Sequence, residues 1–563
     1  MSKTIKKLLA LLLALSLLAG LAGCASSEEP EETQASAVTV KPVKKDPCTE
    51  LGTPLADVRI RQALVYAIDM DTIIEALFYD NARRAVSFTA PLSEDLAEYE
   101  YNPEKAKALL AEAQWPSDYV LDVVYYYDDQ QTVDLLNVIG SYWEAVGVHA
   151  EFRKIEGDLT SQLWKTPAYE ESGVQWDLAY GAVAALTEAE FYNRFASDAS
   201  NNSHTPEIEG LDAAIEADDY SQVQRILAEN VSFLPLFHQN CFVYTSDHIN
   251  TAGAVHGNDQ FAYEKDILNW TTDREDNTLY TDGGPEEFFS YPVVNPGLYL
   301  YQELLFERLL TSDSDLNPGE GQLAESYRLS ADGKTLEFIL REDATWHDGE
   351  PLTVEDVKFT FELYMQCSGA NSVLADTLDK LEGAESFLNG DAKECSGIVV
   401  EENKVTFRFA ESAPDALMVF AQWPVLPKHK LENVRPNKLQ QNKFWKNPIG
   451  SGPYKVAEVQ LGEYCILERW EDYRLEGDGN IDFIYMTASG ETDRDLAVLA
   501  QLDRIDYAWG KATDDADYIG NLEGICVEKV EIPYTRCFFI NQYPHESYIA
   551  LQQAEEETAA PTE

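Results

Sequence analysis

One stretch of the chain alternates between strand and helix patterns, and this alternation limits the fold more than any other feature. Residues 120–127 are an apolar run typical of a buried strand, and residues 133–146 carry apolar side chains at helical spacing. Val148, Ala150 and Phe152 then alternate with polar residues, as in a half-buried strand. A strand, a helix and a strand in this order predict an α/β fold, with helices on the faces of a mixed or parallel sheet.

Capping residues predict where other helices begin. Asp57 can cap one helix, Thr72 with Glu75 fits a capping box, and Asn102 precedes a proline at the first helical position of another. Later in the chain, Thr353 is expected to cap a helix over residues 354–365, with an acid three positions on closing the box.

Hairpin signals become common after about residue 277. The turn Ala331-Asp332-Gly333-Lys334 separates strand-like runs at residues 327–329 and 335–340. Residues 403–409 are a further strand-like run, so we expect an antiparallel sheet in this part of the chain.

Acidic residues outnumber basic ones by 99 to 42, which gives the 563-residue chain a formal net charge of −57. This excess would repel a phosphate backbone and thus excludes nucleic acid as a partner. It also argues against docking on anionic lipid through the folded surface. The length is sufficient for three or four domains of ~150 residues.

The first 23 residues have the pattern of an export signal. Three lysines precede an apolar run at residues 8–23, which is too short for a membrane span, and no later stretch approaches ~18 apolar residues. Leu21-Ala22-Gly23-Cys24 resembles the bacterial lipoprotein box, which implies that Cys24 carries a lipid and becomes the first mature residue. An ordinary secreted protein is the alternative. We expect an extracytoplasmic protein, at the cell surface or in the periplasm, that contacts the bacterial cell membrane only through this lipid.

Several long segments are similar to one known family. The longest, residues 323–362, contains LSADGKTLEFILREDATWHDGEPLTVEDVKFTFE. It resembles the signature region of the family 5 extracellular solute-binding proteins, the peptide-, nickel- and opine-type receptors of ABC importers. Further similar segments lie at residues 54–74, 101–113, 201–215, 225–244, 427–429, 448–456 and 467–473.

The order of these segments differs from that of the family. Residues of about 48–272 resemble the family's second half, and residues of about 277–545 resemble its first half. The resemblance therefore implies a circular permutation, which a chain tolerates where the old ends are close and the new ends fall in an exposed loop. A fusion or assembly artefact that joins halves of two neighbouring receptors is the alternative.

The resemblance implies a periplasmic-binding-protein-like type II (cluster C) fold with two lobes and an extra inserted domain. Of the two segments that cross between the lobes, one is expected near residues 237–243, and the other, between Asn541 and Pro54, is expected to be cut. The expected parts are a lipoprotein signal peptide (1–23), a flexible tether (24–47), the second lobe (48–242), the first lobe (243–306 and 441–545), the inserted domain (307–440) and an acidic tail (546–563).

The same resemblance implies a ligand site between the lobes that needs no catalysis and no cofactor. One wall is the loop at about residues 285–295, although its aromatic side chains could equally belong to the core; it offers Phe288, Phe289, Tyr291 and Asn295. The other wall follows residues 176–179, and its expected ligand-binding residues are Tyr180, Gly181, Ala182, Val183, Leu186, Asn201 and Asn202.

Two positions of this second wall depart from the peptide-binding members. Leu186 stands where those members place an Asp that pairs with the peptide's α-amino group, and Val183 stands where a tryptophan is common. A buried ammonium without a carboxylate is costly. Glu188 or Glu190 could substitute, so the class of ligand stays open.

Enzymatic and metal sites lack the necessary patterns. The run Gly450-Ser451-Gly452 does not have the G-x-S-x-G spacing of a nucleophile elbow. Glu355 and Asp356 are adjacent on a helix and cannot face one substrate. The seven cysteines besides Cys24 show no zinc-ligand spacing, and His347 beside Asp348 belongs to a motif that is structural in the family.

We therefore expect a monomeric, lipid-anchored receptor that captures oligopeptides and delivers them to the permease of an ABC importer. The alternatives are a receptor for another small solute such as a nickel chelate or an opine, a peptide-sensing lipoprotein without transport, and a decayed fusion without a ligand. Carbohydrate hydrolysis is a distant enzymatic alternative.

Overall fold

The computed structural model describes residues 53–79, 81–92, 96–127, 129–157, 162–163, 176–197, 199, 204–254, 267–284, 292–293, 300–312, 317–413, 415–488, 493–510, 513–531 and 534–542. None of the helices in these ranges is long and apolar enough to cross a membrane. The expected signal peptide, tether and acidic tail, and with them Cys24, lie outside the described residues.

A six-stranded sheet takes five of its strands from the first part of the described chain. Its order is β1-β5-β21-β4-β2-β3. Strands β2, β3 and β4 are parallel, and α5 (Gln130–Ala145) connects β2 to β3, which confirms the strand–helix–strand prediction. The strands are β1 (Ala82–Arg84), β2 (Val120–Tyr125), β3 (His149–Lys154), β4 (Leu178–Val183), β5 (Phe233–Gln239) and β21 (Thr535–Ile540).

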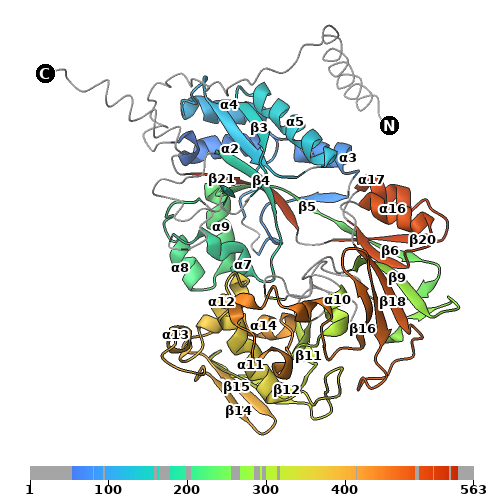
Figure 1. Ribbon diagram of the computed structural model, residues 1–563. Helices are drawn as coiled ribbons and strands as arrows, with labels where there is room; N and C mark the ends of the chain where they lie inside the picture. The colour runs from blue at the N-terminus through green and yellow to red at the C-terminus, as the bar shows by residue number, and fades with distance from the viewer. Residues whose placement is uncertain are drawn as a thin grey trace, which may run out of the picture. The chain divides into compact units, whose positions relative to one another are not determined.

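Helices cover both faces of this sheet (Figure 1). Along β21, Phe538 and Ile540 join one apolar cluster, whereas Cys537 and Phe539 join another, because successive side chains of a strand point to opposite faces. The first cluster includes residues of α2 (Val58–Tyr66), α3 (Met70–Leu77), α4 (Pro103–Glu112) and α5, and the second includes residues of α7 (Glu188–Tyr192), α8 (Leu211–Glu216) and α9 (Tyr220–Asn230).

The helix starts follow the capping signals, with one exception. The carboxylate of Asp57 accepts from the Arg59 amide at α2, and the side chain of Asn102 accepts from the Lys105 amide at α4. The expected box at Thr72 is wrong, because Asp69 is the N-cap of α3 and accepts from the amide of Thr72. Asp is a strong capping residue, so the helix begins at Met70, before Thr72 can act as a cap.

A second, seven-stranded sheet has the order β16-β17-β18-β9-β19-β6-β20. Its centre is parallel, since β9 runs parallel to both β18 and β19, and its outer pairs are antiparallel. Helices α16 (Asp493–Gln501) and α17 (Thr513–Ile519) follow β18 and β19 in the chain. The strands are β6 (Cys241–Ser246), β9 (Thr278–Gly284), β16 (Tyr454–Gln460), β17 (Tyr464–Arg469), β18 (Phe483–Ala488), β19 (Tyr507–Gly510) and β20 (Ile525–Val530).

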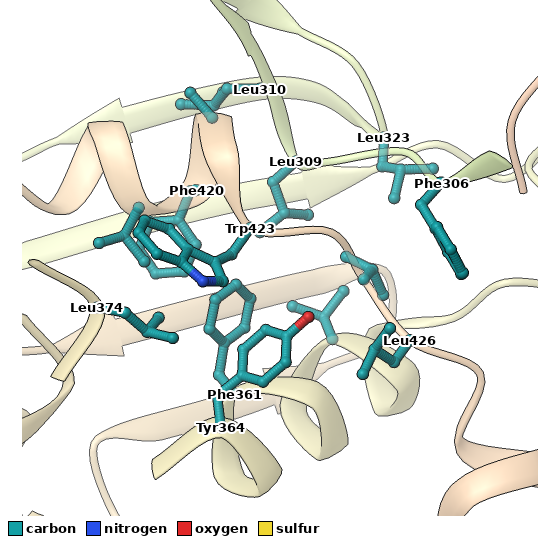
Figure 2. Close-up of a cluster of buried hydrophobic side chains, with 14 of the residues drawn as sticks. Phe306, Leu309, Leu310, Leu323, Phe361, Tyr364, Leu374, Phe420, Trp423 and Leu426 are labelled. Carbon is teal, nitrogen blue, oxygen red and sulfur yellow. The ribbon is translucent and has the colours of Figure 1, made fainter. Parts of the chain in front are cut away.

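A four-stranded antiparallel sheet, β12-β13-β15-β14, lies within the expected inserted domain. The hairpin of β12 (Ala324–Leu329) and β13 (Thr335–Leu340) confirms the predicted turn, and α11 (Val354–Met365) has the predicted capping box. Phe361 of α11 packs against Phe407 and Phe420 in a dense aromatic core (Figure 2). The remaining elements of this region are β14 (Ile398–Glu401), β15 (Lys404–Arg408), α12 (Ser372–Asp379), α13 (Ala384–Leu388), α14 (Ala416–Gln422) and α15 (Lys428–Leu431).

Shorter elements complete the described chain. Helix α10 (Leu300–Leu305) precedes the small sheet of β10 (Leu310–Ser312) and β11 (Pro318–Gly321). Strands β7 (Ile249–Asn250) and β8 (Thr271–Thr272) form another pair. Single 3-10 turns are η2 (Pro54–Ala56), η3 (Asn193–Phe195), η5 (Ile267–Asn269), η6 (Pro436–Lys438) and η7 (Lys443–Lys446).

The chain passes twice between the six- and seven-stranded sheets. The first passage leads from β5 to β6, and the second leads from β20 to β21. The two passages touch, because the Gln239 amide donates to the Tyr534 carbonyl at 2.9 Å. The expectation that residues 441–545 belong to one lobe is wrong for β21, which pairs with β4 and β5 of the other sheet. The apolar strand β21 lies at the centre of the six-stranded sheet, where it pairs with the otherwise open edges of β4 and β5. The second passage between the sheets is therefore the segment from β20 to β21, and it is intact.

Gly450 lies where the backbone of α10 leaves no room for a side chain. A Cβ on Gly450 would lie 1.7 Å from the Leu305 carbonyl oxygen, and that oxygen also accepts from the amides of Ser451 and Gly452. We expect Gly450→Ala to destabilise the fold by about 1–3 kcal/mol, because backbone and not a flexible side chain must move. Thermal denaturation checks this. Gly520→Ala, which meets a methyl group of Val527 at 3.0 Å, should cost less, and an equal loss in both variants would contradict the argument.

Candidate functional site

Part of the expected second wall lies at the carboxyl edge of the six-stranded sheet, where ligands of open α/β sheets bind. Tyr180, Gly181, Ala182 and Val183 are in β4, next to β21. Tyr180 is 2% exposed and packs against Tyr127 and Phe538, so it is part of the core beneath this edge. Ala182 is half-buried, while Gly181 and Val183 are buried.

The other expected site residues cannot be placed. Phe288, Phe289, Tyr291 and Asn295 of the first wall, and Asn201 and Asn202 of the second, lie outside the described residues. They remain predictions.

Leu186 is buried in the apolar cluster that also contains Val243 of the seven-stranded sheet and Leu374 of α12. Its amide donates to the carboxylate of Glu190 at 2.7 Å, and the other oxygen of Glu190 accepts from the side-chain amide of Asn371 at 2.9 Å. Glu188 accepts instead from the hydroxyl of Thr89 at 3.0 Å. Glu190 thus joins the loop after β4 to residues 307–440, the expected inserted domain (here the inserted region), and neither glutamate is without a partner.

A cavity of about 680 Å³ lies beside this contact. One side comes from α7, η3 and α8, and the other from α12 and the segment before α14. The charged side chains of its lining are six acids and two bases: Glu190, Asp218, Asp376, Asp379, Glu411 and Asp415, with Arg194 and Lys380. Its volume falls within the range of sites for small molecules, ~300–1,000 Å³.

Burial disfavours the charged form of two carboxylates at this cavity, those of Glu190 and Asp415. Burial raises the pKa of Glu190, although the hydrogen bonds from Leu186 and Asn371 act in the opposite direction. Burial also raises the pKa of Asp415, which Asp218 and Asp376 raise further and Lys380 lowers. Asp415 accepts from the hydroxyl of Thr187 at 3.5 Å, so it lies at the second contact between α7 and the inserted region.

We expect Asp415→Asn to raise the melting temperature at pH 7 by about 1 °C and to reduce its dependence on pH. A folded carboxyl with a raised pKa binds its proton more tightly than the unfolded one. Stability is therefore lost as pH rises from the ordinary pKa of 3.8 through the raised value, and asparagine removes this loss. Thermal melts between pH 4 and 8 check this. The exposed Asp391→Asn is the control, and a parallel downward shift of the Asp415 variant at every pH would contradict the prediction.

The sequence reasoning missed one residue at this edge. Arg536, the second residue of β21, lies opposite Ala182 in the register and is 9% exposed. Its guanidinium carbon is 4.3 Å from the centre of the Tyr127 ring and 5.1 Å from that of Tyr534. The sequence shows only that Arg536 precedes the apolar run of residues 537–540, where an arginine is uncommon.

The described residues offer no group of three or more His, Cys, Asp or Glu side chains that could hold a metal ion. His347 instead fixes the backbone of the Gly450 segment: its Nδ1 accepts from the Gly450 amide, and its Nε2 donates to the Gly452 carbonyl. Burial lowers the pKa of His347 to about 4, so the ring stays neutral in this role. Asp348 binds His429 and Lys430.

The sequence model of the bacterial extracellular solute-binding proteins, family 5 Middle, matches residues 31–203 and 320–553, more than half of the chain. A protein of Brucella ovis named as an ABC transporter peptide-binding protein is 32% identical over 184 residues, which are 32% of this chain and 32% of that relative. The probable peptide-binding protein YejA of Agrobacterium fabrum is 32% identical over 175 residues, 30% of this chain and 26% of its own. The chain thus spans about a third or less of the length of these relatives.

Solved structures with partial similarity include two binding proteins with ligands. The oligopeptide-binding protein AppA of Bacillus subtilis, in complex with a nonapeptide, is 23% identical with a TM-score of 0.37, over 44% of this chain and 46% of that chain. NikZ of Campylobacter jejuni, in complex with Ni(L-His), is 23% identical with a TM-score of 0.34, over 42% and 43%.

Proposed function

Since this chain belongs to the bacterial extracellular solute-binding proteins of family 5, we propose that it captures a small solute outside the cytoplasm and delivers it to the permease of an ABC importer. The description of the family is that of proteins that bind solutes. The cavity of about 680 Å³ between α7 and α12 is the observation that carries the proposal. It lies between the six-stranded sheet's helices and the inserted region, where a bound solute would touch both.

The two contacts beside the cavity support a site that closes around its ligand. The Glu190–Asn371 and Thr187–Asp415 hydrogen bonds join the loop after β4 to the inserted region, and they involve single polar side chains. Such contacts are weak enough to open and reform, as domain closure around a solute requires.

Oligopeptides are the proposed solute class. The support is the names of the Brucella and Agrobacterium relatives, which describe peptide-binding proteins. The cavity lining carries more acids than bases, so it suits a solute with a positively charged group, such as the ammonium of a peptide. A nickel chelate or another small solute remains the alternative within this class.

Thermal melts with and without a mixed pool of di- to pentapeptides test this function. A ligand at a hundred times its dissociation constant adds ~2.7 kcal/mol and should raise the melting temperature by a few degrees. Ala375→Trp, which fills the cavity from α12, should abolish the shift, while the exposed Ala213→Trp on α8 should retain it. A wild-type melt that no pool member shifts would contradict peptide binding.

We also propose that the chain uses the family fold with its two halves in exchanged order. The support is the position of the two described ends: Arg61 donates to the carbonyls of Leu55 and Ala56 and to those of Asn230 and Val231, which precede β5. The end of β21 is in the same region, because Phe539 pairs with Phe233. A chain that runs from residue 277 to 542 and then from 53 to 272 should therefore fold and bind the same peptide pool. If the rearranged chain does not fold while the chain in its present order folds, the proposed permutation is refuted.

The lipid anchor on Cys24 is a further proposal, supported by the Leu-Ala-Gly-Cys sequence. Metabolic labelling with a palmitate analogue should mark the wild-type protein and not Cys24→Ala. Labelling of both would place the modification elsewhere.

A further inference from the structure

Arg536 is a buried cation without an acidic partner among the described residues. Its Nε donates to the side-chain oxygen of Gln239 at 3.0 Å, and its Nη1 has no hydrogen-bond partner. Arg274 is paired with Asp506 and Arg474 with Glu307, while the buried Arg61 donates to four backbone carbonyls instead of a carboxylate. Buried charges are normally paired because removing an ion from water costs several kcal/mol.

Tyrosine rings surround the guanidinium of Arg536. Its carbon is 4.3 Å from the ring centre of Tyr127, 5.1 Å from that of Tyr534 and 5.9 Å from that of Tyr180. Burial raises the pKa of Tyr127 and Tyr180, so these phenols stay neutral and cannot supply the missing negative charge. Ring faces recover only part of the lost hydration of a cation.

The place of this group in the fold favours a ligand as the missing partner. Arg536 follows Thr535, which pairs with Val183, the last residue of β4, so it lies at the carboxyl edge just before the loop that leads into α7. Tyr127 follows the end of β2 at the same edge. The residue opposite Arg536 in β4 is Ala182, which is small and half-buried. The edge therefore carries no bulky side chain at that position.

We propose that Arg536 binds the carboxylate of the transported solute, and that the tyrosines around it hold the guanidinium in the orientation for a two-point pair. A planar guanidinium donates two parallel hydrogen bonds to a carboxylate, which a lysine cannot do. This inference rests on the proposed solute-binding function and narrows its ligand. It places the acidic end of the solute at the edge beside β21, outside the cavity between α7 and α12, which Arg536 does not line. The solute is recognised by an acidic end, while Leu186 leaves the loop after β4 without a side-chain carboxylate for an ammonium.

Two matched peptide pools test this assignment. The same di- to pentapeptides are prepared with free C-terminal carboxylates and with amidated C-termini, and each pool is titrated against the full chain by calorimetry and thermal melt. We expect the free-acid pool to bind and the amidated pool to bind roughly 100-fold more weakly, as for the loss of one partner of a buried charge pair.

Variants of the chain complete the test. Arg536→Gln should bind the free-acid and amidated pools equally weakly, and Arg536→Lys should recover only part of the difference. Arg504→Gln is the matched control, because that arginine also lies over tyrosine rings, those of Tyr280 and Tyr485, but on the other sheet. The comparison of pools on the wild type holds even if Arg536→Gln does not fold.

The outcomes separate the two proposals. Equal binding of both pools by the wild type, or unchanged binding by a folded Arg536→Gln, would overturn the carboxylate site and leave solute binding intact. Binding of neither pool by the wild type would overturn peptide binding, and the carboxylate site with it.

Discussion

Replacing Arg274 by glutamine is expected to destabilise the seven-stranded sheet by about 3–5 kcal/mol, the cost of breaking a buried ion pair from one side. The guanidinium of Arg274 donates to both carboxylate oxygens of Asp506, at 2.8 and 2.9 Å. Asp506 is completely buried and also accepts from the Tyr280 amide and the Ser246 hydroxyl. Without the arginine, its negative charge would lose the only cation in its set of described contacts.

A double variant separates this mechanism from a general loss of packing. Arg274→Gln combined with Asp506→Asn should recover much of the melting temperature, because the buried charge is removed together with its partner. Arg504→Gln, which also faces the Tyr280 ring, should change the melting temperature little. A double variant that is as unstable as the sum of the two single ones would contradict the argument. Arg274 lies in the turn between β8 and β9, so the result also reports on the segment where the proposed exchange would join the two halves.

Arg61→Met is expected to destabilise the six-stranded sheet by about 4 kcal/mol, since several buried acceptors lose a charged donor at once. The guanidinium donates to the carbonyls of Leu55, Ala56, Asn230 and Val231, at distances of 2.6–3.1 Å. The side chain is 3% exposed, so water cannot replace these hydrogen bonds without opening the structure. Burial lowers the pKa of Arg61 to about 10, which leaves it charged at neutral pH.

The neighbouring Arg59 provides the control. Its side chain is 43% exposed and binds Asp57, so Arg59→Met should cost less than 1 kcal/mol, as for other surface pairs. Urea melts of both variants measure the difference. Equal urea midpoints for the Arg61 and Arg59 variants would show that the buried carbonyls find other donors. They would contradict the role of Arg61 in holding η2 to the end of α9.

Local signals in the sequence predicted the local structure well. The box at Thr353 and Asp356, the cap at Asn102 and the turn around Gly333 depend on residues a few positions apart, and each forms as expected. The start of α3 was missed for the same kind of reason. Asp69 and Thr72 are both able to cap a helix, and the stronger of the two begins the helix earlier.

The assignment of β21 to a sheet could not be read from local signals. Residues 535–540 are all buried, which is typical of a central strand, but this property does not say which sheet the strand joins. Its partners β4 and β5 come from the other end of the chain. The motif resemblance placed the boundary between the two lobes after β21, whereas the strand pairing places this boundary before β21.

The candidate site was predicted as a region and not as a set of side chains. Residues of β4 lie at the expected edge, but Leu186 is a core residue that fills space between the loop and the inserted region. Arg536 was missed because its meaning depends on the tyrosines around it, which come from three separate segments. The charges at the cavity depend in the same way on helices that only the fold brings together.

The position of β21 also sets a limit on how the protein can assemble. During synthesis, β4 and β5 emerge more than 290 residues before the strand that separates them in the sheet. Until then their inner edges have unpaired amides and carbonyls, which are a template for association with other chains. Such distant pairing makes folding slow and exposes it to aggregation. A chaperone that holds the nascent chain, or export before folding, would therefore determine how much native protein a cell obtains.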